Sequence, residues 1–484
     1  MRVDHTKAPR RRRANPPLMI ELDRNSDTSL SRQIYLSLRD AILSGRVVAN
    51  FRLSATRVLA AELGVARTTV LAAYEQLLAE GFLYGRGSAG TFVTSLILPR
   101  NQQSHDRNAR RSPGPRHSTH PLPRPFRIGE PAIDLFPSAV WNRLMARRAR
   151  AGRLAFIGYG EGIGYRPLRQ AIAEYTAASR GVRTTVERVI LVRGAQQAID
   201  LVARVLLHPG DGVWFEDPGY PLARRIFELS GAVIVPLPLD NDGLIVDAGI
   251  RRAPSARIAH VAPSHQFPLG TTMSLERRLA LLAWAVRANA WIVEDDYDSE
   301  FRYPGRPIAS LQGLDHADRV IYVGTFSKTA FPALRLGYLI VPEELVERFV
   351  AMQTTVDHFA PTVEQAALAD FIEDGHFSRH LRRMRAAYAE RQDALLHAAE
   401  RELSGLMTVE PADAGMHAIG WLSHPKADDK VISSRALDEG VEAPALSSYC
   451  VDAALPPALL LGFACVQPEA MPSAMRILRQ ILKA

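Results

Sequence analysis

The apolar residues near the start of the chain recur at helical intervals. Leu30 opens a stripe that returns every four positions as far as Ile42, a spacing that lays one helix face on a core. A second helix is expected over residues 55–63 and a third from Arg67 onwards, with Gly64 in the turn between them. Helix, short glycine-containing turn and helix are typical of a helix-turn-helix, whose second helix enters the DNA major groove. In the helix at 55–63 we expect three side chains to face inward: Val58, Leu59 and Leu63.

A hairpin is expected directly after the third helix. Residues 82–84 are apolar, residues 85–90 are rich in glycine, and residues 91–93 are apolar again. Two apolar runs joined by a glycine-rich turn indicate a β-hairpin. Beside a helix-turn-helix, this hairpin is interpreted as a wing.

The composition changes on both sides of this segment. Residues 1–20 include a run of four arginines without periodicity, which predicts a mobile basic arm. From about residue 95 the aliphatic residues give way to Pro, Ser, Arg, Asn and His, which predicts a semi-rigid basic spacer. The expected domains are an arm at 1–25, a DNA-binding domain at 26–94, a linker at 95–127 and a large domain at 128–484.

The large domain shows alternating helical and strand patterns. Short β-branched runs at 189–192, 258–261, 291–293 and 320–323 are separated by helical stretches. This alternation indicates an α/β fold with a largely parallel sheet. A chain of 484 residues is also long enough for one large domain and one small one.

Charge is distributed unevenly between the two parts. Residues 1–127 hold 21 Lys and Arg against 9 Asp and Glu, whereas residues 128–484 hold 38 against 42. The net charge of +8 therefore comes from the N-terminal part, which predicts contact with the phosphate backbone of double-stranded DNA. The alternative interpretation is a solvated basic tail.

Other classes of protein receive no support from the sequence. No uncharged apolar stretch of about eighteen residues occurs, and no apolar run follows the N-terminal arginines, so we expect no membrane contact and a cytoplasmic location. The two cysteines, Cys450 and Cys465, lack any metal-ligand spacing. Neither a metal site nor a disulfide scaffold is therefore expected.

Candidate chemistry follows two of the expected strands. The run 291–293 leads into Asp295, at the place where open parallel sheets bind ligands. The run 320–323 leads into hydroxyl residues and Lys328, with Arg335 seven positions on. The amine can form a Schiff base with an aldehyde, hydroxyls and guanidinium can bind a phosphate, and the carboxylate can keep a pyridine nitrogen protonated.

The N-terminal part resembles the GntR-type winged helix-turn-helix. The stretch 57–70 reads RVLAAELGVARTTV, and the expected wing ends in GTFV at 90–93. The chain departs from the family at Ser54, where proline is usual, and at Ala66, where serine is usual. Arginine offers a planar fork to phosphate or guanine, and hydroxyl and amide groups at a helix start suit phosphate. The residues that the resemblance implies for DNA contact are Arg57, Arg67, Thr68, Thr69 and Arg86.

Residues 128–465 resemble the fold-type I aminotransferases and, more closely, the MocR/GabR subfamily of GntR-type regulators. The resemblance implies pyridoxal 5'-phosphate as cofactor and Lys328 as the lysine that forms the Schiff base with it. Asp295 would pair with the pyridine nitrogen, Tyr297 with the ring hydroxyl, and Tyr220 would stack on the ring. The residues implied to hold the phosphate are Gly194, Ala195, Gln196, Thr325, Ser327 and Arg335.

Three further residues complete the expectations for this domain. Tyr159 resembles a tyrosine that reaches the phosphate across a dimer interface, which implies a homodimer. Asp298 and Glu300, in the acidic run after residue 293, are expected to be structural or solvent-facing.

The chain departs from the aminotransferases where they hold the substrate carboxylate. An arginine near the C-terminus usually orients that group, and Leu460 stands at its position here. Leu222 stands where some amino-acid-sensing relatives have another arginine, although Arg224 and Arg225 could substitute. Efficient transamination is therefore not expected. The effector remains open between an amino acid, an amine and pyridoxal phosphate itself.

Three functions are compatible with these patterns. The favoured one is a DNA-binding transcriptional regulator in which chemistry at Lys328 modulates operator binding. The second is an active aminotransferase with an accessory DNA-binding module, and the third is a DNA binder whose second domain serves only for dimerisation. The complete set of Lys328, Asp295, Tyr297 and Arg335 argues against the third function, and Leu460 against the second.

Arg67→Ala should lower the affinity for operator DNA by about 1–3 kcal/mol if Arg67 makes a bidentate base contact. Titration of labelled operator DNA with the native and substituted chains measures this difference. An unchanged affinity would show that Arg67 does not make this contact with a base.

Overall fold

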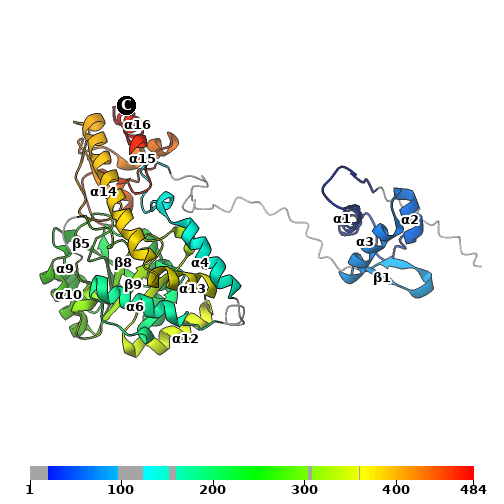
Figure 1. The fold of residues 1–484 in the computed structure, drawn as a ribbon, viewed down its shortest axis with the longest axis horizontal. Coiled ribbons are helices and arrows are strands. Elements are labelled where there is room, and N and C mark those ends of the chain that lie inside the picture. The colour runs from blue at the N-terminus through cyan, green and yellow to red at the C-terminus, as the bar shows by residue number, and fades with distance from the viewer. Residues whose placement is uncertain (1–19, 96–123, 152–159, 304–307, 359, 484) are drawn as a thin grey trace, which may run out of the picture. The chain divides into compact units, whose positions relative to one another are not determined.

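The structure is a computed structural model that describes residues 20–95, 124–151, 160–303, 308–358 and 360–483 (Figure 1). The chain forms two compact units, Met1–Arg116 and His117–Ala484, called the small and the large unit below. Tyr159 lies outside the described residues, so its role stays a prediction.

The small unit is a helix-turn-helix with a hairpin. Its helices share one apolar core in which Ile34, Leu38 and Val70 are fully buried. Gly64 ends the second helix with a φ of 63°, a conformation that residues with a side chain disfavour, and so allows the tight turn into the third. The two wing strands pair antiparallel, as predicted. The elements are α1 (Leu30–Leu43), α2 (Thr56–Leu63), α3 (Arg67–Ala79), β1 (Leu83–Gly85) and β2 (Thr91–Val93).

Two details of the small unit differ from the prediction. Val58 does not face inward but is 51% exposed, whereas its neighbour Leu59 is buried in the core as predicted. Residues 20–25, predicted to end a mobile arm, contact the unit. Leu22 packs on its core, and the side chain of Gln33 accepts a hydrogen bond from the backbone N–H of residue 23 at 2.9 Å.

The large unit is built on an eight-stranded sheet in the order β3-β10-β9-β8-β7-β4-β5-β6. The neighbours from β9 to β5 run parallel, whereas β10 and β6 run antiparallel to theirs. The predicted largely parallel sheet is therefore confirmed. The strands are β3 (Val189–Val192), β4 (Gly212–Asp217), β5 (Val233–Asp240), β6 (Gly243–Leu244), β7 (Ile258–Val261), β8 (Trp291–Asp296), β9 (Val320–Thr325) and β10 (Gly337–Ile340).

Helices cover both faces of this sheet. Successive strand residues point to opposite faces, so on β3 Val189 and Leu191 join one apolar cluster while Ile190 and Val192 join another. Helices α4, α6 and α13 contribute to the first cluster, and α7, α8 and α12 to the second. Helices α9 and α10 cover the far end of the first face. The bounds are α4 (Ser138–Arg150), α6 (Arg166–Arg180), α7 (Ala195–Leu206), α8 (Pro221–Leu229), α9 (Val246–Arg252), α10 (Leu275–Ala288), α11 (Leu311–Leu314), α12 (Val346–Val356) and α13 (Thr362–Glu373).

The C-terminal part adds a three-stranded antiparallel sheet in the order β11-β12-β13. The 28-residue helix α14 runs from the α/β layer to this part, where α15 and α16 lie (Figure 1). Within the described ranges, no helix combines the length and the apolar character needed to cross a bilayer. The elements are α14 (His376–Leu403), β11 (Met407–Val409), β12 (His417–Leu422), α15 (Asp429–Asp438), β13 (Ala458–Gly462) and α16 (Met471–Lys483).

Residues 124–127, which the sequence analysis placed in the linker, are part of the large unit. Phe126 is fully buried in its core, and the N–H of Gly462 donates to the Phe126 carbonyl at 2.9 Å, next to β13. The N–H of Glu442 donates to the Pro125 carbonyl, also at 2.9 Å. A single aromatic residue among prolines has no periodicity, which is why the sequence did not reveal this contact.

We expect Phe126→Ala to lower the free energy of unfolding of the large unit by about 3–5 kcal/mol, because it leaves a cavity in place of a buried ring. All five tryptophans lie in this unit, so tryptophan fluorescence during urea unfolding reports it alone. Ile133→Ala serves as control, since Ile133 is 45% exposed and should change the value by only about 0.5 kcal/mol. Equal effects of the two substitutions would contradict the burial of Phe126.

Candidate functional site

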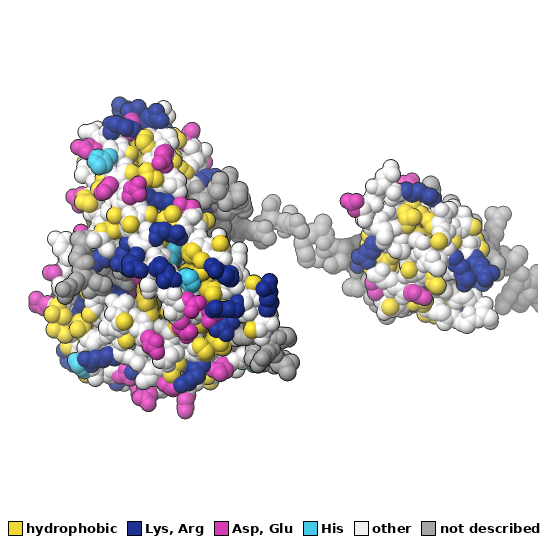
Figure 2. All heavy atoms as spheres, viewed as in Figure 1, with side chains coloured by type: hydrophobic (Ala, Val, Ile, Leu, Met, Phe, Trp, Pro, Cys, Tyr) yellow, Lys and Arg dark blue, Asp and Glu magenta, His cyan; other side chains and the backbone are white. Residues whose placement is uncertain are grey.

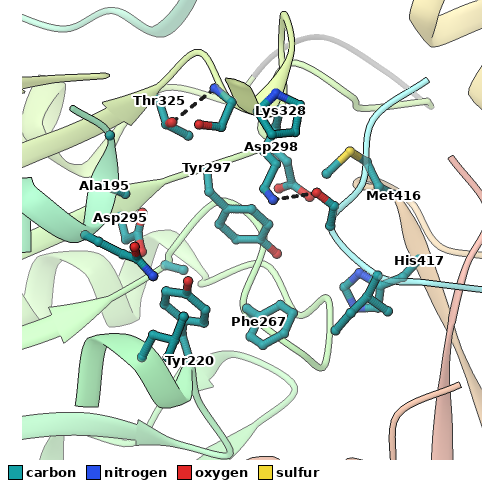
Figure 3. Close-up of a pocket in the computed structure, with 18 of the residues that line it drawn as sticks. Ala195, Tyr220, Phe267, Asp295, Tyr297, Asp298, Thr325, Lys328, Met416 and His417 are labelled. Atoms are coloured by element: carbon teal, nitrogen blue, oxygen red, sulfur yellow. Dashed lines mark hydrogen bonds between the residues drawn. The ribbon is translucent and has the colours of Figure 1, made fainter. Parts of the chain in front are cut away.

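A cavity of about 440 Å³ opens at one edge of the large sheet. Strands β3, β4, β7, β8 and β9 run in the same direction and contribute residues at or just after their carboxyl ends, where open parallel sheets bind ligands. Figure 3 shows the side chains of Asp295, Tyr297 and Lys328 converging there. A cavity of this size suits a small molecule.

The cavity brings together the residues that the sequence analysis assigned to a cofactor. They come from four segments widely separated along the chain, so their meeting is a property of the fold. Tyr159 is outside the described residues, and the roles of the others remain predictions. The predicted residues that line the cavity are Gly194, Ala195, Gln196, Tyr220, Asp295, Tyr297, Thr325, Ser327, Lys328 and Arg335.

The acidic run at the end of β8 contains one carboxylate without a partner. Oδ1 of Asp295 is buried and has no hydrogen-bond partner among the described residues. Its Oδ2 lies 3.7 Å from Nε2 of His260, which is longer than a hydrogen bond. The neighbouring acids are occupied by other groups: Glu294 by the N–H groups of Leu311 and Gln312, Asp296 by Arg180, and Asp298 by His265.

The environment of Asp295 disfavours its charge as long as no cation is present. Burial raises the pKa of Asp295 to about 7, and repulsion from Asp296 and Asp298 adds to the shift. His260 supplies no compensating charge, because burial lowers the pKa of its imidazole to about 4. An unpaired buried carboxylate is costly. This oxygen therefore fits a ligand that offers a cationic N–H group.

Lys328 lies in the loop after β9 and directs its amine into the cavity. Its Nζ donates to the carbonyl oxygen of Gly129 at 2.5 Å (Figure 3). Burial lowers the pKa of this amine, and Glu130 partly offsets that effect. A lower pKa favours the neutral amine, which is the nucleophilic form.

Tyr297 is oriented by a pair of residues that the sequence analysis did not identify as functional. Nδ1 of His265 lies 2.9 Å from Oδ1 of Asp298 and 2.9 Å from the hydroxyl oxygen of Tyr297. Because a carboxylate oxygen accepts hydrogen bonds, Nδ1 carries the proton and donates to both oxygens. The O–H of Tyr297 is thereby left to donate to another group. A Cβ on Gly415 would lie 2.1 Å from this imidazole, so a glycine is needed beside it.

The two later acids, expected to be structural or solvent-facing, both make structural contacts. Asp298 is not solvent-facing, because its side chain is only 1% exposed and lines the cavity. Glu300 is half-buried and accepts a hydrogen bond from the hydroxyl of Tyr175 at 3.1 Å, which is a structural contact.

The turn between β3 and α7 offers donors for an anion. Gly194 precedes the helix with a φ of 104°, and the N–H groups of Ala195 and Gln196 open its first turn. Helix starts attract anions through such N–H groups. Arg335 lines the same cavity, and its guanidinium makes no hydrogen bond or ion pair with the described residues. The N–H of Ser327 donates to the hydroxyl of Thr325 at 3.1 Å.

Several wall residues were not found by sequence reasoning. Residues 127–130, at the predicted end of the linker, form part of the wall, and so do Phe267 and His417. Burial lowers the pKa of His417 to about 4. For residues 127–130 the sequence does contain a signal, because the apolar and glycine residues at 126–129 stand out within a proline-rich stretch. For His417 the sequence contains no such signal.

The small unit displays its predicted DNA-contacting residues on the surface. Arg57, Arg67, Thr68 and Arg86 are exposed, and Thr69 is half-exposed. Figure 2 shows Lys and Arg side chains at several places on the surface of this unit. Their contact with DNA remains a prediction.

The start of α3 is open to an anion. Its N-cap residue is Ala66, which has no capping side chain, so Thr68 does not cap the helix. Nε of Arg67 donates to the hydroxyl of Thr56 at 3.4 Å, which places the arginine between the starts of α2 and α3. On the hairpin, the guanidinium of Arg86 lies 5.3 and 5.4 Å from the ring centroids of Tyr84 and Phe92. Cation–π contacts of this kind stabilise the position of the guanidinium beside the two rings of the wing.

Both units match known protein families. Residues 30–93 match the family described as bacterial regulatory proteins, gntR family. Residues 128–478 match aminotransferase class I and II. A solved structure of LysN, an alpha-aminoadipate aminotransferase from Thermus thermophilus complexed with N-(5'-phosphopyridoxyl)-L-leucine, aligns with a TM-score of 0.67 and 30% identity, over 74% of this chain and 91% of LysN.

Transcriptional regulators match along almost the whole chain. The probable rhizopine catabolism regulatory protein MocR from Rhizobium meliloti is 41% identical over 477 residues, which cover 96% of each protein. The HTH-type pyridoxine biosynthesis transcriptional regulator PdxR from Corynebacterium glutamicum is 31% identical over 450 residues, covering 92% of this chain and 94% of PdxR. With both domains present in the same order, the chain belongs to the MocR subfamily of GntR-type transcriptional regulators.

Proposed function

We propose that this regulator detects a small amino compound through pyridoxal phosphate held in the cavity, and changes its binding to operator DNA in response. The observation that carries the proposal is the unpartnered, buried oxygen of Asp295 in the cavity that also contains the buried amine of Lys328. These two groups are complementary to a protonated ring nitrogen and an aldehyde. Within the described residues, Oδ1 of Asp295 has no cationic N–H partner, and the amine of Lys328 has no aldehyde with which to react.

The remaining wall residues fit the other parts of this cofactor. Tyr297 has an O–H free to donate to the ring oxygen, and Tyr220 would lie against the ring face. Arg335 has no competing partner among the described residues and would hold the phosphate together with the hydroxyls of Thr325 and Ser327. The N–H groups at Gly194, Ala195 and Gln196 would complete the phosphate site. When bound, pyridoxal phosphate supplies an aldehyde that condenses with amines and a ring that withdraws electrons.

A homodimer is part of this proposal. Tyr159 resembles the tyrosine that completes the phosphate site from a second copy of the chain. Dimeric helix-turn-helix proteins also read paired half-sites on DNA. Two copies would thus share both the ligand site and the operator.

Lys328→Ala should abolish covalent attachment of the cofactor, because no other group in the cavity offers a buried amine among the described wall residues. After incubation with pyridoxal phosphate and reduction with borohydride, mass spectrometry should find the cofactor on the Lys328 peptide of the native chain. Lys426→Ala, at an exposed lysine, is the matched control and should behave like the native chain. Amino compounds should shift the operator affinity of the loaded native chain but not that of Lys328→Ala.

Two outcomes would contradict the proposed function. One is a native chain that retains no cofactor after reduction. The other is an operator affinity that no amino compound changes. Steady turnover with a keto-acid acceptor would instead favour an active aminotransferase with an accessory DNA-binding module. Light scattering on the same samples reports whether two copies associate.

Asp295→Asn should stabilise the cofactor-free chain more at pH 8 than at pH 5. The carboxyl has a pKa near 3.8 when unfolded and about 7 in the folded chain, because of burial. The unfolded state therefore loses the proton first, and the cost to the folded state grows between about pH 4 and pH 7 and is constant above. The extra gain at pH 8 should be about 2–3 kcal/mol in the free energy of unfolding, measured by urea titration.

The same substitution should weaken the uptake of pyridoxal phosphate, since an amide cannot balance a cationic ring nitrogen. Asp393→Asn is a control at an exposed position of α14 and should change stability equally at both pH values. If Asp295→Asn also behaved in that way, Asp295 would not be the strained carboxylate described above.

A further inference from the structure

The charge of the cavity wall bears on the class of effector, and this inference rests on the proposed function. Three cationic residues line the described wall, namely Lys328, Arg335 and Arg127. The first two are assigned to the cofactor above. Arg127 has no assigned partner in that scheme, although it lies at the point where the chain enters the large unit.

Arg127 is placed with its terminal nitrogens unused. Its Nε lies 3.8 Å from Glu130 and 3.7 Å from Glu442, and both distances are longer than a hydrogen bond. No hydrogen bond of its guanidinium occurs within the described part of the chain. The nearest carboxylates therefore flank the Nε side. The two terminal nitrogens form the planar fork that binds a carboxylate through two parallel hydrogen bonds.

The backbone around Arg127 is held firmly. Phe126 on one side is fully buried, and its carbonyl accepts the N–H of Gly462 at 2.9 Å. A Cβ on Gly462 would lie 2.1 Å from the carbonyl oxygen of Arg127, so a glycine is required for this close approach. The fixed backbone sets the position from which the Arg127 side chain extends to the cavity wall.

The two arginines that the sequence offered as substitutes for the missing carboxylate-binding arginine, Arg224 and Arg225, do not line the cavity. Arg224 and Arg225 both pair with Glu228, at 3.6 and 3.1 Å, and neither lines the cavity. Leu222 does line it, whereas Leu460 is fully buried in a small apolar cluster behind the wall residues Phe267 and Tyr449. The position used by aminotransferases is therefore closed here to a ligand.

We propose that Arg127 binds the carboxylate of the effector through its two terminal nitrogens, so that the effector is an amino compound carrying a carboxylate. Its amino group is directed to the cofactor at Lys328 and its carboxylate to the opposite charge on Arg127. The long contacts to Glu130 and Glu442 orient the guanidinium without occupying its fork. Arg127 then takes the place of the arginine that Leu460 replaces.

The test compares amino acids with the amines that lack only the carboxylate. The cofactor-loaded full chain is titrated with the standard L-amino acids, β-alanine and 4-aminobutyrate, each paired with its decarboxylated amine. The change in absorption of the bound pyridoxal phosphate gives the half-saturating concentration. We expect at least one acid to saturate the native chain about 10–100-fold below its amine, which is the usual effect of a charged hydrogen bond.

Arg127→Gln should bring that ratio close to one. Arg124→Gln removes the same charge three residues away, where Arg124 donates to the carbonyl of Leu437 at 2.8 Å and does not line the cavity. This control should keep the native ratio. A native chain without preference for any acid over its amine would overturn the inference, and so would Arg127→Gln with the native ratio. Failure to take up the cofactor at all would overturn the proposed function as well.

Discussion

The ion pair between Arg180 and Asp296 is the interaction on which the cavity depends. Five acids lie within seven residues at the end of a buried strand, and each would repel the others without a counter-charge. Nε of Arg180 lies 2.9 Å from Asp296 with both side chains almost fully buried, and its Nη2 donates to the hydroxyl of Ser264 at 2.5 Å. The guanidinium thus joins α6, the end of β8 and the loop that begins at residue 263. Arg180 thus partly offsets the charge of Asp296, while Asp295 beside it stays unpaired at the cavity wall.

Two buried polar atoms of the described wall, Oδ1 of Asp295 and Nε2 of His260, have no hydrogen-bond partner. Burial raises the pKa of Asp295 to about 7 and that of the nearby Glu216 to about 8, so the cavity without a ligand holds acids that are hard to ionise. Such groups reduce stability, and proteins retain them mainly where a ligand supplies the missing charge. The regulator therefore resembles an enzyme in the interior of its large unit.

The regular elements were the part that the sequence could predict. Periodicity located the helix-turn-helix, the wing and the strands before Asp295 and Lys328, because each depends on local spacing. Family resemblance selected Asp295 from a run of acids, and the structure adds the physical reason, since its neighbours are occupied. Contacts between distant segments could not be predicted: Phe126 lies against Gly462, and His265 orients Tyr297 from another loop. Val58 was misplaced because a two-turn helix has too few residues to define its buried face.

The carbonyl oxygen of Gly129 binds the amine of Lys328, to which the cofactor is proposed to attach. It accepts the hydrogen bond of Lys328, and it belongs to a segment that begins a few residues after the linker. If the cofactor attaches at Lys328 as proposed, this carbonyl loses its donor and must find another. Attachment of the cofactor would then change the hydrogen bonding of the segment that connects the large unit to the linker.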